Sequence, residues 1–412
     1  MQLDIDFVRQ QFSQLDDDPE FVFASNAGGS FVCNQVNDLM THYNRHTRVQ
    51  PYSRFSPSRE AGQAMDRAKQ LWADTLNIQQ AELTIGPSTS INTYVMSQAI
   101  STAWVAGDEI IVTNQDHEAN SGVWRRKALE KGVTIKQWEV DKQTGLLDIE
   151  QLLPSLSHKT RWVFFTHCSN IVGTANPVAE ITRQIKAQSN ARVFVDAVAH
   201  APHHIHDLKQ LGVDGYVFSL YKVFGPHQSI LYVNQAIHAE LSSQAHYFNI
   251  GKAGYDFNPA GPQHSQVAAC AGVVDYFDTL HLHHYGDSNV SQPQKMADLH
   301  SLFQAHENSL AQPILSFLDH HADVQLIGKP QVNDNDRAPT IAFKPLRQSS
   351  EALASQLQDS GIGTENGNFY AHRLVTDLGF DADDGVVRIS LVHYDRACDV
   401  EKILLELDRA LN

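Results

Sequence analysis

The sequence predicts an α/β fold with a large domain built on a mostly parallel sheet, followed by a small C-terminal α+β domain. Over about the first 290 residues, short β-rich runs alternate with longer helical patterns, the order expected of a parallel α/β sheet. Several of the runs are apolar throughout, as in strands that are buried on both faces. After about residue 290 the pattern changes to that of a compact α+β unit.

Five strands and two helices are expected in the large domain. The strands are residues 109–113 (EIIVT), 161–166 (RWVFFT), 192–196 (RVFVD), 215–219 (GYVFS) and 229–233 (SILYV). The helices are residues 58–76, with Ser58 as the expected cap, and residues 90–104, which end before a turn-like Gly107-Asp108.

The C-terminal part is expected to have a different order of helices and strands. Helices are predicted over residues 295–310, 350–360 and 398–411, and strands over residues 324–327, 340–343 and 386–392. Pro313 is expected to break the first helix or to start a new one. The predicted boundaries are residues 1–20 for an N-terminal segment that packs near the small domain, 21–290 for the large domain and 291–412 for the small domain.

Composition narrows the class of protein. The chain has 412 residues and a formal net charge of −16, so its surface repels phosphate backbones and a nucleic-acid partner is not expected. It has four cysteines and no CxxC pair, which favours a reducing compartment. The N-terminus lacks the apolar core of a signal peptide, and the apolar runs are too short to span a bilayer. A soluble, cytoplasmic protein without a membrane partner is expected.

Polar side chains follow four of the expected strands, and in open α/β sheets ligands bind beyond the carboxyl ends of the strands. His117 follows the strand at 109–113, and Asn170 follows the strand at 161–166. Asp196 ends a third strand and Lys222 follows a fourth. These side chains are therefore expected to meet at one edge of the sheet.

The residue types match the needs of a pyridoxal phosphate (PLP) site. Such a site needs a lysine for a Schiff base, here Lys222, and a carboxylate that keeps the pyridine nitrogen protonated, here Asp196. It needs a phosphate cup at a helix N-terminus, for which residues 86–90 (GPSTS) offer Ser88 and Thr89. It also needs a flat group against the ring and a cation for the substrate carboxylate, for which His117 and Arg388 are candidates.

Each residue alone has an ordinary structural interpretation. A lysine after a strand is usually solvated, an aspartate or serine at such a position is usually a helix cap, and an arginine on a strand is usually an ion-pair partner. The joint arrangement in this order is what favours a cofactor site.

Five segments resemble the class V aminotransferases, and within them the branch of cysteine desulfurases and selenocysteine lyases. Residues 219–226 (SLYKVFGP) are similar to the family's S-x-H-K-x-x-G-P lysine motif. The other four segments, in family order along nearly the whole chain, are residues 26–28 (NAG), 116–120 (DHEAN), 166–174 (THCSNIVGT) and 388–391 (RISL).

The resemblance implies a fold-type I PLP-dependent transferase that is a homodimer with active sites at the subunit interface. It implies that Lys222 binds the cofactor and moves protons, that Asp196 pairs with the pyridinium nitrogen and that His117 stacks on the ring. Phosphate contacts are implied for Ser88, Thr89, Ser219 and Tyr221. Substrate contacts are implied for Asn26, Asn170, Arg388 and Tyr370.

The chain also departs from the family pattern. Tyr370, in residues 365–370 (ENGNFY), stands where the desulfurases carry the persulfide-forming cysteine, and a phenol cannot accept sulfur as a thiolate does. Ala199 stands where the family often has a glutamine, so the neighbouring His200 is the expected substitute donor to the cofactor. Tyr221 replaces a histidine, and Gly261 replaces the threonine that contacts the partner subunit's phosphate. The chain thus resembles a desulfurase-like subgroup that lacks the active-site cysteine.

Two hypotheses follow. The first is a PLP-dependent enzyme acting at the α-carbon of an amino acid, as a desulfurase- or selenocysteine lyase-like enzyme, or alternatively as an aminotransferase or epimerase. The second is a PLP-fold binding or regulatory protein, whose activity would survive Lys222→Ala. Histidines cluster at residues 203–206 (HHIH) and 281–284 (HLHH) without a recognisable zinc spacing, so no metal is expected. Nucleotide-binding and hydrolase motifs are absent from the sequence.

Overall fold

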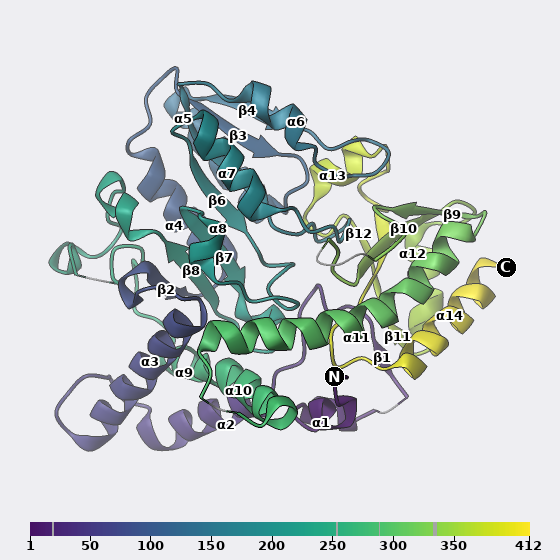
Figure 1. Cartoon of the computed structure of the whole chain (residues 1–412), viewed down its shortest axis with the longest axis horizontal. Helices are drawn as coiled ribbons and strands as arrows, with labels where there is room; N and C mark the ends of the chain where they lie inside the picture. Colours follow the sequence, from purple (N-terminus) through teal and green to yellow (C-terminus); the bar gives the residue numbers. More distant parts are fainter. Residues whose placement is uncertain (19, 253, 288, 333–335) are drawn as a thin grey trace.

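The structure is a computed structural model that describes residues 1–18, 20–252, 254–287, 289–332 and 336–412. A seven-stranded sheet forms the centre of the large part of the molecule, with the order β2-β8-β7-β6-β5-β3-β4 (Figure 1). Its strands are β2 (Leu83–Gly86), β3 (Glu109–Thr113), β4 (Thr134–Trp138), β5 (Thr160–Thr166), β6 (Arg192–Asp196), β7 (Gly215–Ser219) and β8 (Ser229–Val233).

The direction of the strands decides where a ligand can bind. The pairs β3–β4, β3–β5, β5–β6 and β6–β7 are parallel, whereas β8 is antiparallel to both of its neighbours, β2 and β7. The carboxyl ends of every strand except β8 therefore lie at the same edge of the sheet. The expected mostly parallel sheet is confirmed, and it places the segments after β2, β3, β5, β6 and β7 side by side.

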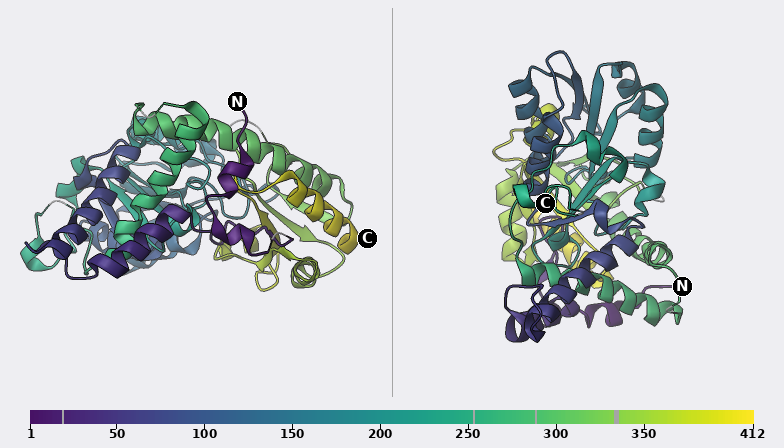
Figure 2. Two further views of the ribbon diagram at one scale, coloured as in Figure 1. Left: turned by 90° about the horizontal axis from the view of Figure 1, so that it is seen from below. Right: turned by 90° about the vertical axis from the view of Figure 1, so that its left-hand side faces the viewer.

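Helices cover both faces of this sheet, because alternate residues of each strand point to opposite faces. On β5, Val163 and Phe165 pack in one core and Trp162 and Phe164 in the other. The second view of Figure 2 shows the sheet between its helices. One core contains residues of α3 (Ser56–Thr75), α7 (Val178–Gln188) and α10 (Ala271–Tyr285), and the other contains residues of α4 (Thr89–Ser101) and α5 (Gly122–Lys131).

The C-terminal part has its own four-stranded antiparallel sheet, in the order β12-β13-β10-β9. The strands are β9 (Val324–Ile327), β10 (Thr340–Pro345), β12 (Glu365–Gly367) and β13 (Val386–Ser390). Its core contains apolar residues of α11 (Gln292–His320), α12 (Ser350–Asp359) and α14 (Ala397–Leu411). The expected small α+β domain is confirmed, and α11 extends from the large part to the small one in Figure 1.

The N-terminal segment contacts both parts. In α1 (Ile5–Arg9), the Arg9 side chain donates to the carbonyl of Tyr394, whereas the Asp4 carboxylate before the helix binds His283 on α10. Further on, β1 (Val22–Phe23) pairs in parallel with β11 (Ile362–Gly363) and so joins the core of the small part. The predicted boundary at residue 21 remains a proposal, although residues 22–24 pack with the small part.

Two expectations about helices were wrong. Pro313 lies inside α11, which continues through it to His320, because the neighbouring Ile314 and Leu315 are buried in the core of the small part. Tertiary packing therefore outweighs the cost of the missing N–H group. Ser58 does not cap α3, which begins at Ser56; its hydroxyl instead donates to the carbonyl of Gln50 and holds the preceding loop.

Five further helices complete the α-helical elements among the described residues. They are α2 (Asn34–His42), α6 (Ile149–Leu152), α8 (Leu208–Leu211), α9 (His264–Ala269) and α13 (His372–Asp377). In the part of the chain that the structure describes, none of the helices combines the length and the apolar character needed to cross a membrane.

Candidate active site

Lys222 lies at the carboxyl edge of the large sheet. It ends the short 3-10 helix η6 (Leu220–Lys222), which follows β7 directly. The side chain is buried, and burial together with the nearby Arg388 lowers the pKa of its amine to about 8. Among the described residues, none forms a hydrogen bond or an ion pair with its Nζ atom, so the amine is available to react.

Asp196 is the last residue of β6, beside β7 in the sheet. Its Oδ1 atom accepts a hydrogen bond of 2.9 Å from the backbone N–H of Val198. Burial raises the pKa of this carboxyl to about 6, although that hydrogen bond and the charge of Lys222 act in the opposite direction. A buried carboxylate of this kind gains most from a cationic partner such as a protonated pyridine.

His117 follows β3 and caps the 3-10 helix η4 (Glu118–Asn120), where its Nδ1 atom accepts from the N–H of Ala119 at 3.1 Å. Burial and the charge of Lys222 lower the pKa of this ring to about 4, so it is neutral. The Tyr370 ring lies 5.1 Å away from it, centre to centre, at an angle of 34°. Tyr370 is 72% exposed and so lies at the surface beside His117.

A group of hydroxyls lies at the N-terminus of α4. Ser88 is the N-cap and accepts from the N–H of Ile91 at 3.2 Å. The hydroxyl of Thr89 lies 2.8 Å from that of Ser219 and 3.1 Å from that of Ser229. Such a helix N-terminus with hydroxyl donors is suited to an anion.

Gly86, the last residue of β2, lies directly before the short turn that leads into α4. A Cβ atom there would come within 1.9 Å of the Asn92 side chain in the first turn of α4. A side chain at residue 86 would therefore force the buried Asn92 side chain out of its place. The sequence GPSTS thus folds into a strand, a tight turn and a helix start at this edge of the sheet.

Arg388 lies on the central β13 of the small sheet and is buried. Its Nη1 atom donates to the carbonyl of Asn170 at 3.2 Å, and its Nη2 atom lies 3.8 Å from the carboxylate of Glu365. The Nε atom has no hydrogen-bond partner among the described residues. Burial lowers the pKa of this guanidinium to about 10, so it stays charged at neutral pH. A buried cation with an open N–H group is suited to a substrate carboxylate.

One cavity of about 230 Å³ joins most of the predicted site residues. Of the predicted residues, it is lined by Ser88, Thr89, His117, Asn170, Asp196, Ser219, Tyr221 and Lys222. Arg388 and Tyr370 lie beside it, through their contacts with Asn170 and His117.

The three other predicted residues neither line this cavity nor contact its lining as Arg388 and Tyr370 do. Asn26 is buried, and its amide binds the carbonyls of Phe23 and Ser390, so its side chain holds the N-terminal segment instead of a substrate. His200 was expected to contact the cofactor, but the turn after β6 directs it into a second cavity, while Ala199 lines the first. Gly261 is exposed in the loop before α9, and apart from its neighbours in the chain no described residue lies within 4 Å of where its Cβ atom would be.

Sequence reasoning missed several residues of the cavity wall, among them Thr166, Cys168, Val198 and His227. The imidazole of His227 stacks on Tyr221 at 4.8 Å and lies 3.2 Å, at Nδ1, from the carbonyl of Pro87. The sequence contained a signal for the place of His227, which lies just before β8. The start of an antiparallel strand lies at the same edge of the sheet as the carboxyl ends of its neighbours.

The fold and this cavity define a class of protein, and comparisons with known proteins agree. The family model described as aminotransferase class-V matches residues 22–403, so the chain belongs to that family, whose enzymes depend on PLP. A relative from Gibberella zeae, the aminotransferase-like protein FGM3, is 34% identical over 99% of this chain and 98% of its own length. The cysteine desulfurase-like protein ustD of Aspergillus flavus is 27% identical over 98% of this chain and 90% of its own.

Solved structures show the same fold. An apo cysteine desulfurase from Thermococcus onnurineus NA1 superposes with a TM-score of 0.85 and 20% identity, covering 100% of this chain and 98% of that one. The cysteine desulfurase CsdA of Escherichia coli gives a TM-score of 0.83 and 20% identity, with 99% and 98% covered. At this identity the likeness establishes the fold alone.

The residues present fit the cofactor of the family. The cavity combines a buried amine that makes no hydrogen bond or ion pair with the described residues, a buried carboxylate, a neutral imidazole and hydroxyls at a helix N-terminus. These are the groups that PLP needs for its aldehyde, its pyridine nitrogen, its ring face and its phosphate, respectively.

Proposed function

We propose that the chain is a PLP-dependent enzyme that acts at the α-carbon of a small amino acid, with Lys222 as the residue that binds the cofactor. The observation that carries the proposal is the buried amine of Lys222 in one cavity with Asp196 and His117. A protein that only uses the fold as a scaffold has no need to bury an unpaired amine, because its desolvation is costly.

Bound PLP supplies an electron sink that stabilises negative charge at the α-carbon. Asp196 would hold a proton on the pyridine nitrogen, and the neutral ring of His117 would lie against the cofactor. Arg388, together with the amide of Asn170, would orient the substrate carboxylate. The amine of Lys222, with its pKa of about 8, would take the proton from the α-carbon and return it.

The four cysteines argue against a persulfide on the enzyme. Cys168 lines the cavity, but burial raises the pKa of its thiol to about 12, which leaves it protonated and a poor nucleophile. Cys33 and Cys270 are buried in the large core, and Cys398 is exposed on α14. Tyr370, which contacts His117 beside the cavity, carries a phenol instead of a thiol, so we propose a desulfurase- or selenocysteine lyase-like elimination without a protein-bound sulfur.

An aminotransferase is the second candidate. It is favoured by the match over almost the whole length to the aminotransferase-like protein of Gibberella zeae. Lys222 would again move the proton released from the α-carbon, and Asp196, His117 and Arg388 would keep the same roles, so the two reactions would use the same residues.

We further propose a cytoplasmic homodimer with active sites at the subunit interface. The loop region before α9 carries Gly261 and exposes Tyr247, Phe248 and Ile250, which are 86%, 59% and 59% accessible. An exposed apolar cluster of this kind is typical of a surface that another subunit covers.

The test is the visible absorption spectrum of the PLP-loaded protein before and after each amino acid of a panel that includes L-cysteine, with analysis of the products. One amino acid is expected to shift the band. Sulfide and a second carbon product would support elimination, and a keto acid with an aminated cofactor would support transamination. Lys222→Ala is expected to abolish the band, whereas the exposed Lys159→Ala keeps it. A protein that takes up no PLP would overturn the proposal.

A further inference from the structure

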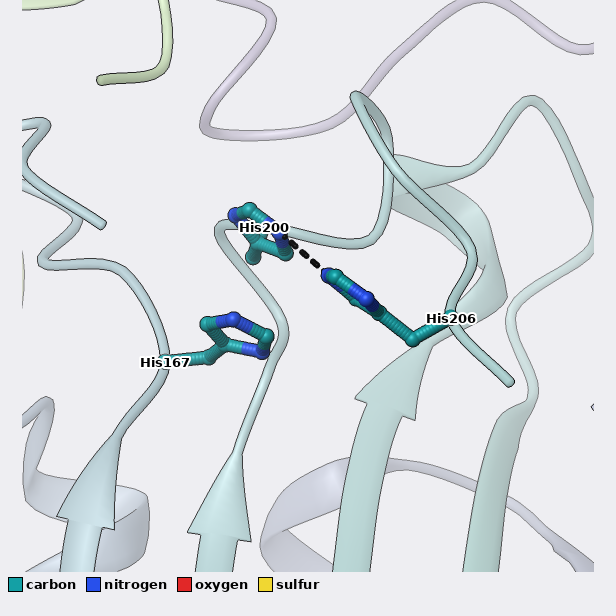
Figure 3. A group of neighbouring side chains, drawn as sticks. All are labelled: His167, His200 and His206. Atoms are coloured by element: carbon teal, nitrogen blue, oxygen red, sulfur yellow. Dashed lines mark hydrogen bonds between the residues drawn. The ribbon is translucent and has the colours of Figure 1, made fainter. Parts of the chain in front are cut away.

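We propose that His167, His200 and His206 form a binding site for a divalent transition-metal ion of the zinc type, separate from the cofactor cavity. One nitrogen of each ring lies within 4.8 Å of the corresponding nitrogens of the other two. Figure 3 shows the three rings grouped together, His167 from the loop after β5 and both His200 and His206 from the loop after β6. The proposal does not depend on the reaction that the enzyme catalyses.

The three residues are brought together by the topology. His167 follows β5 and His200 follows β6, which is its parallel neighbour, while His206 lies further along the loop after β6. The Nε2 atoms of His200 and His206 are only 2.9 Å apart (Figure 3). His167 stacks on His200 at 3.9 Å between ring centres. Spacing along the sequence hid this group, because its members come from two separate strand ends.

The surroundings suit a ligand set. The Nδ1 atom of His167 lies 2.8 Å from the hydroxyl of Tyr216, a contact that orients the ring and leaves its Nε2 atom for an ion. His200 is buried, with only 8% of its surface exposed. Its Nδ1 atom has no hydrogen-bond partner among the described residues. The tautomer with its proton on Nδ1 leaves the lone pair of Nε2, the nitrogen that faces His206, for an ion.

The rings are also neutral, which is the form that binds metals. Burial lowers the pKa of His206 to about 3 and the pKa values of His167 and His200 well below their usual range. Three neutral imidazoles select Zn²⁺, Co²⁺, Ni²⁺ or Cu²⁺ over Mg²⁺ and Ca²⁺, which prefer oxygen ligands.

The group opens into a cavity of about 430 Å³, which leaves space for a water or a small anion as a fourth ligand. His203 and Glu307 lie on the same wall and bind each other, with 2.9 Å between Nδ1 and Oε2. Their direct pairing sets them apart from the three proposed ligands and makes His203 a suitable control.

The position of the site suggests a structural consequence for the cofactor cavity. The backbone N–H of His167 donates to the carbonyl of Asp196 at 2.7 Å. Ala199 lines the cofactor cavity and His200 the second one, so one turn forms part of the wall of both. An ion held by His167 and His200 would therefore fix the segment that carries Asp196, as a positioning site and not a catalytic one.

The test is a calorimetric titration of the PLP-loaded, chelator-treated protein with Zn²⁺, and a Co²⁺ spectrum that reports tetrahedral coordination. The wild type is expected to bind one Zn²⁺ per chain, and both His206→Gln and His200→Gln to weaken binding by roughly 100-fold. His203→Gln and the exposed His320→Gln are the matched controls and are expected to bind as the wild type does.

Thermal unfolding of each variant with and without Zn²⁺ checks that the variants are folded. A Zn²⁺-dependent rise in melting temperature that His206→Gln removes supports the site. No stoichiometric binding by the wild type would overturn the proposal. So would undiminished binding by a folded His206→Gln variant, or an equal loss in His203→Gln.

Discussion

The guanidinium of Arg388 lies on the face of the Phe369 ring, with 3.7 Å between its Cζ atom and the ring centre. Phe369 has a left-handed backbone, with φ of 47°, and its carbonyl accepts from the Nδ2 atom of Asn170 at 2.9 Å. Asn170 in turn accepts from Arg388. The loop before α13 and the strand β13 are therefore tied together around the cation that we propose for the substrate carboxylate.

Phe369→Ala should weaken substrate binding more than it slows turnover. Loss of a cation–π contact at a partly desolvated site costs about 1–2 kcal/mol, which sets an upper bound of roughly 5- to 30-fold on the rise in KM caused by a misplaced Arg388. Phe369→Tyr keeps the ring and is the control. KM and kcat are measured by steady-state kinetics with the substrate identified in the amino-acid panel. A folded alanine variant whose KM stays within twofold of the wild-type value would show that the ring does not position Arg388.

Asp196→Asn should stabilise the apo protein at neutral pH. Burial raises the pKa of Asp196 from 3.8 to about 6, so folding favours the protonated acid. The stability from this residue is complete below pH 3.8 and is lost as the pH rises through about 6. The free energy of unfolding of the variant should therefore rise above that of the wild type between pH 3.8 and about 6. This gap should then stay at about 2–3 kcal/mol up to pH 8.

Urea unfolding of the two apo proteins between pH 4 and pH 8 measures this gap. Bound PLP should close it, because the protonated pyridine compensates the buried carboxylate only in the wild type. A gap that does not change with pH, or that PLP widens, would contradict the assigned partner of Asp196.

The rate at which the apo protein takes up PLP should depend on the protonation of Lys222. Only the neutral amine reacts with an aldehyde, and the pKa of this amine is lowered to about 8 by burial and by Arg388. The rate should therefore rise about tenfold per pH unit below pH 8 and level off above it. Stopped-flow absorbance between pH 6 and pH 10 measures it. A rate that keeps rising towards pH 10 would mean that the amine is not perturbed.

Cys168→Ala should leave the reaction largely intact. The thiol lies 3.3 Å, at its Sγ atom, from the carbonyl of Gly173, and burial keeps it protonated by raising its pKa to about 12. We expect a kcat/KM within about threefold of the wild type and a stability loss of about 1–2 kcal/mol. The exposed Cys398→Ala is the control. A loss of turnover of more than about 100-fold, with sulfane sulfur found on wild-type Cys168, would instead restore a thiol route.

Much of the large sheet was predictable, because its strands are local apolar runs. The strands at 192–196, 215–219 and 229–233 were predicted with their observed bounds. Strand β4 was missed because it lies at the sheet edge and carries polar residues, and β2 because it has only four residues. Pro313 shows the limit of local signals, since the buried contacts that keep α11 continuous come from distant segments.

The site was predictable where a residue's role follows from its place at a strand end. Lys222, Asp196 and His117 meet in one cavity for this reason. The direction of a side chain after the strand was not predictable: the turn that carries Ala199 into the cavity sends His200 to the other side. Asn26 likewise is engaged by the backbone of β13, a contact that no sequence pattern reveals.

The most direct test of the central claim is to reduce the PLP-loaded protein with borohydride and to locate the modified lysine by peptide mass spectrometry. Reduction fixes the cofactor to the lysine that holds it. We predict one pyridoxyl group per chain, on Lys222, and none at that site in the matched Lys222→Ala variant. A label on another lysine, or a fully loaded protein without any label, would contradict the account.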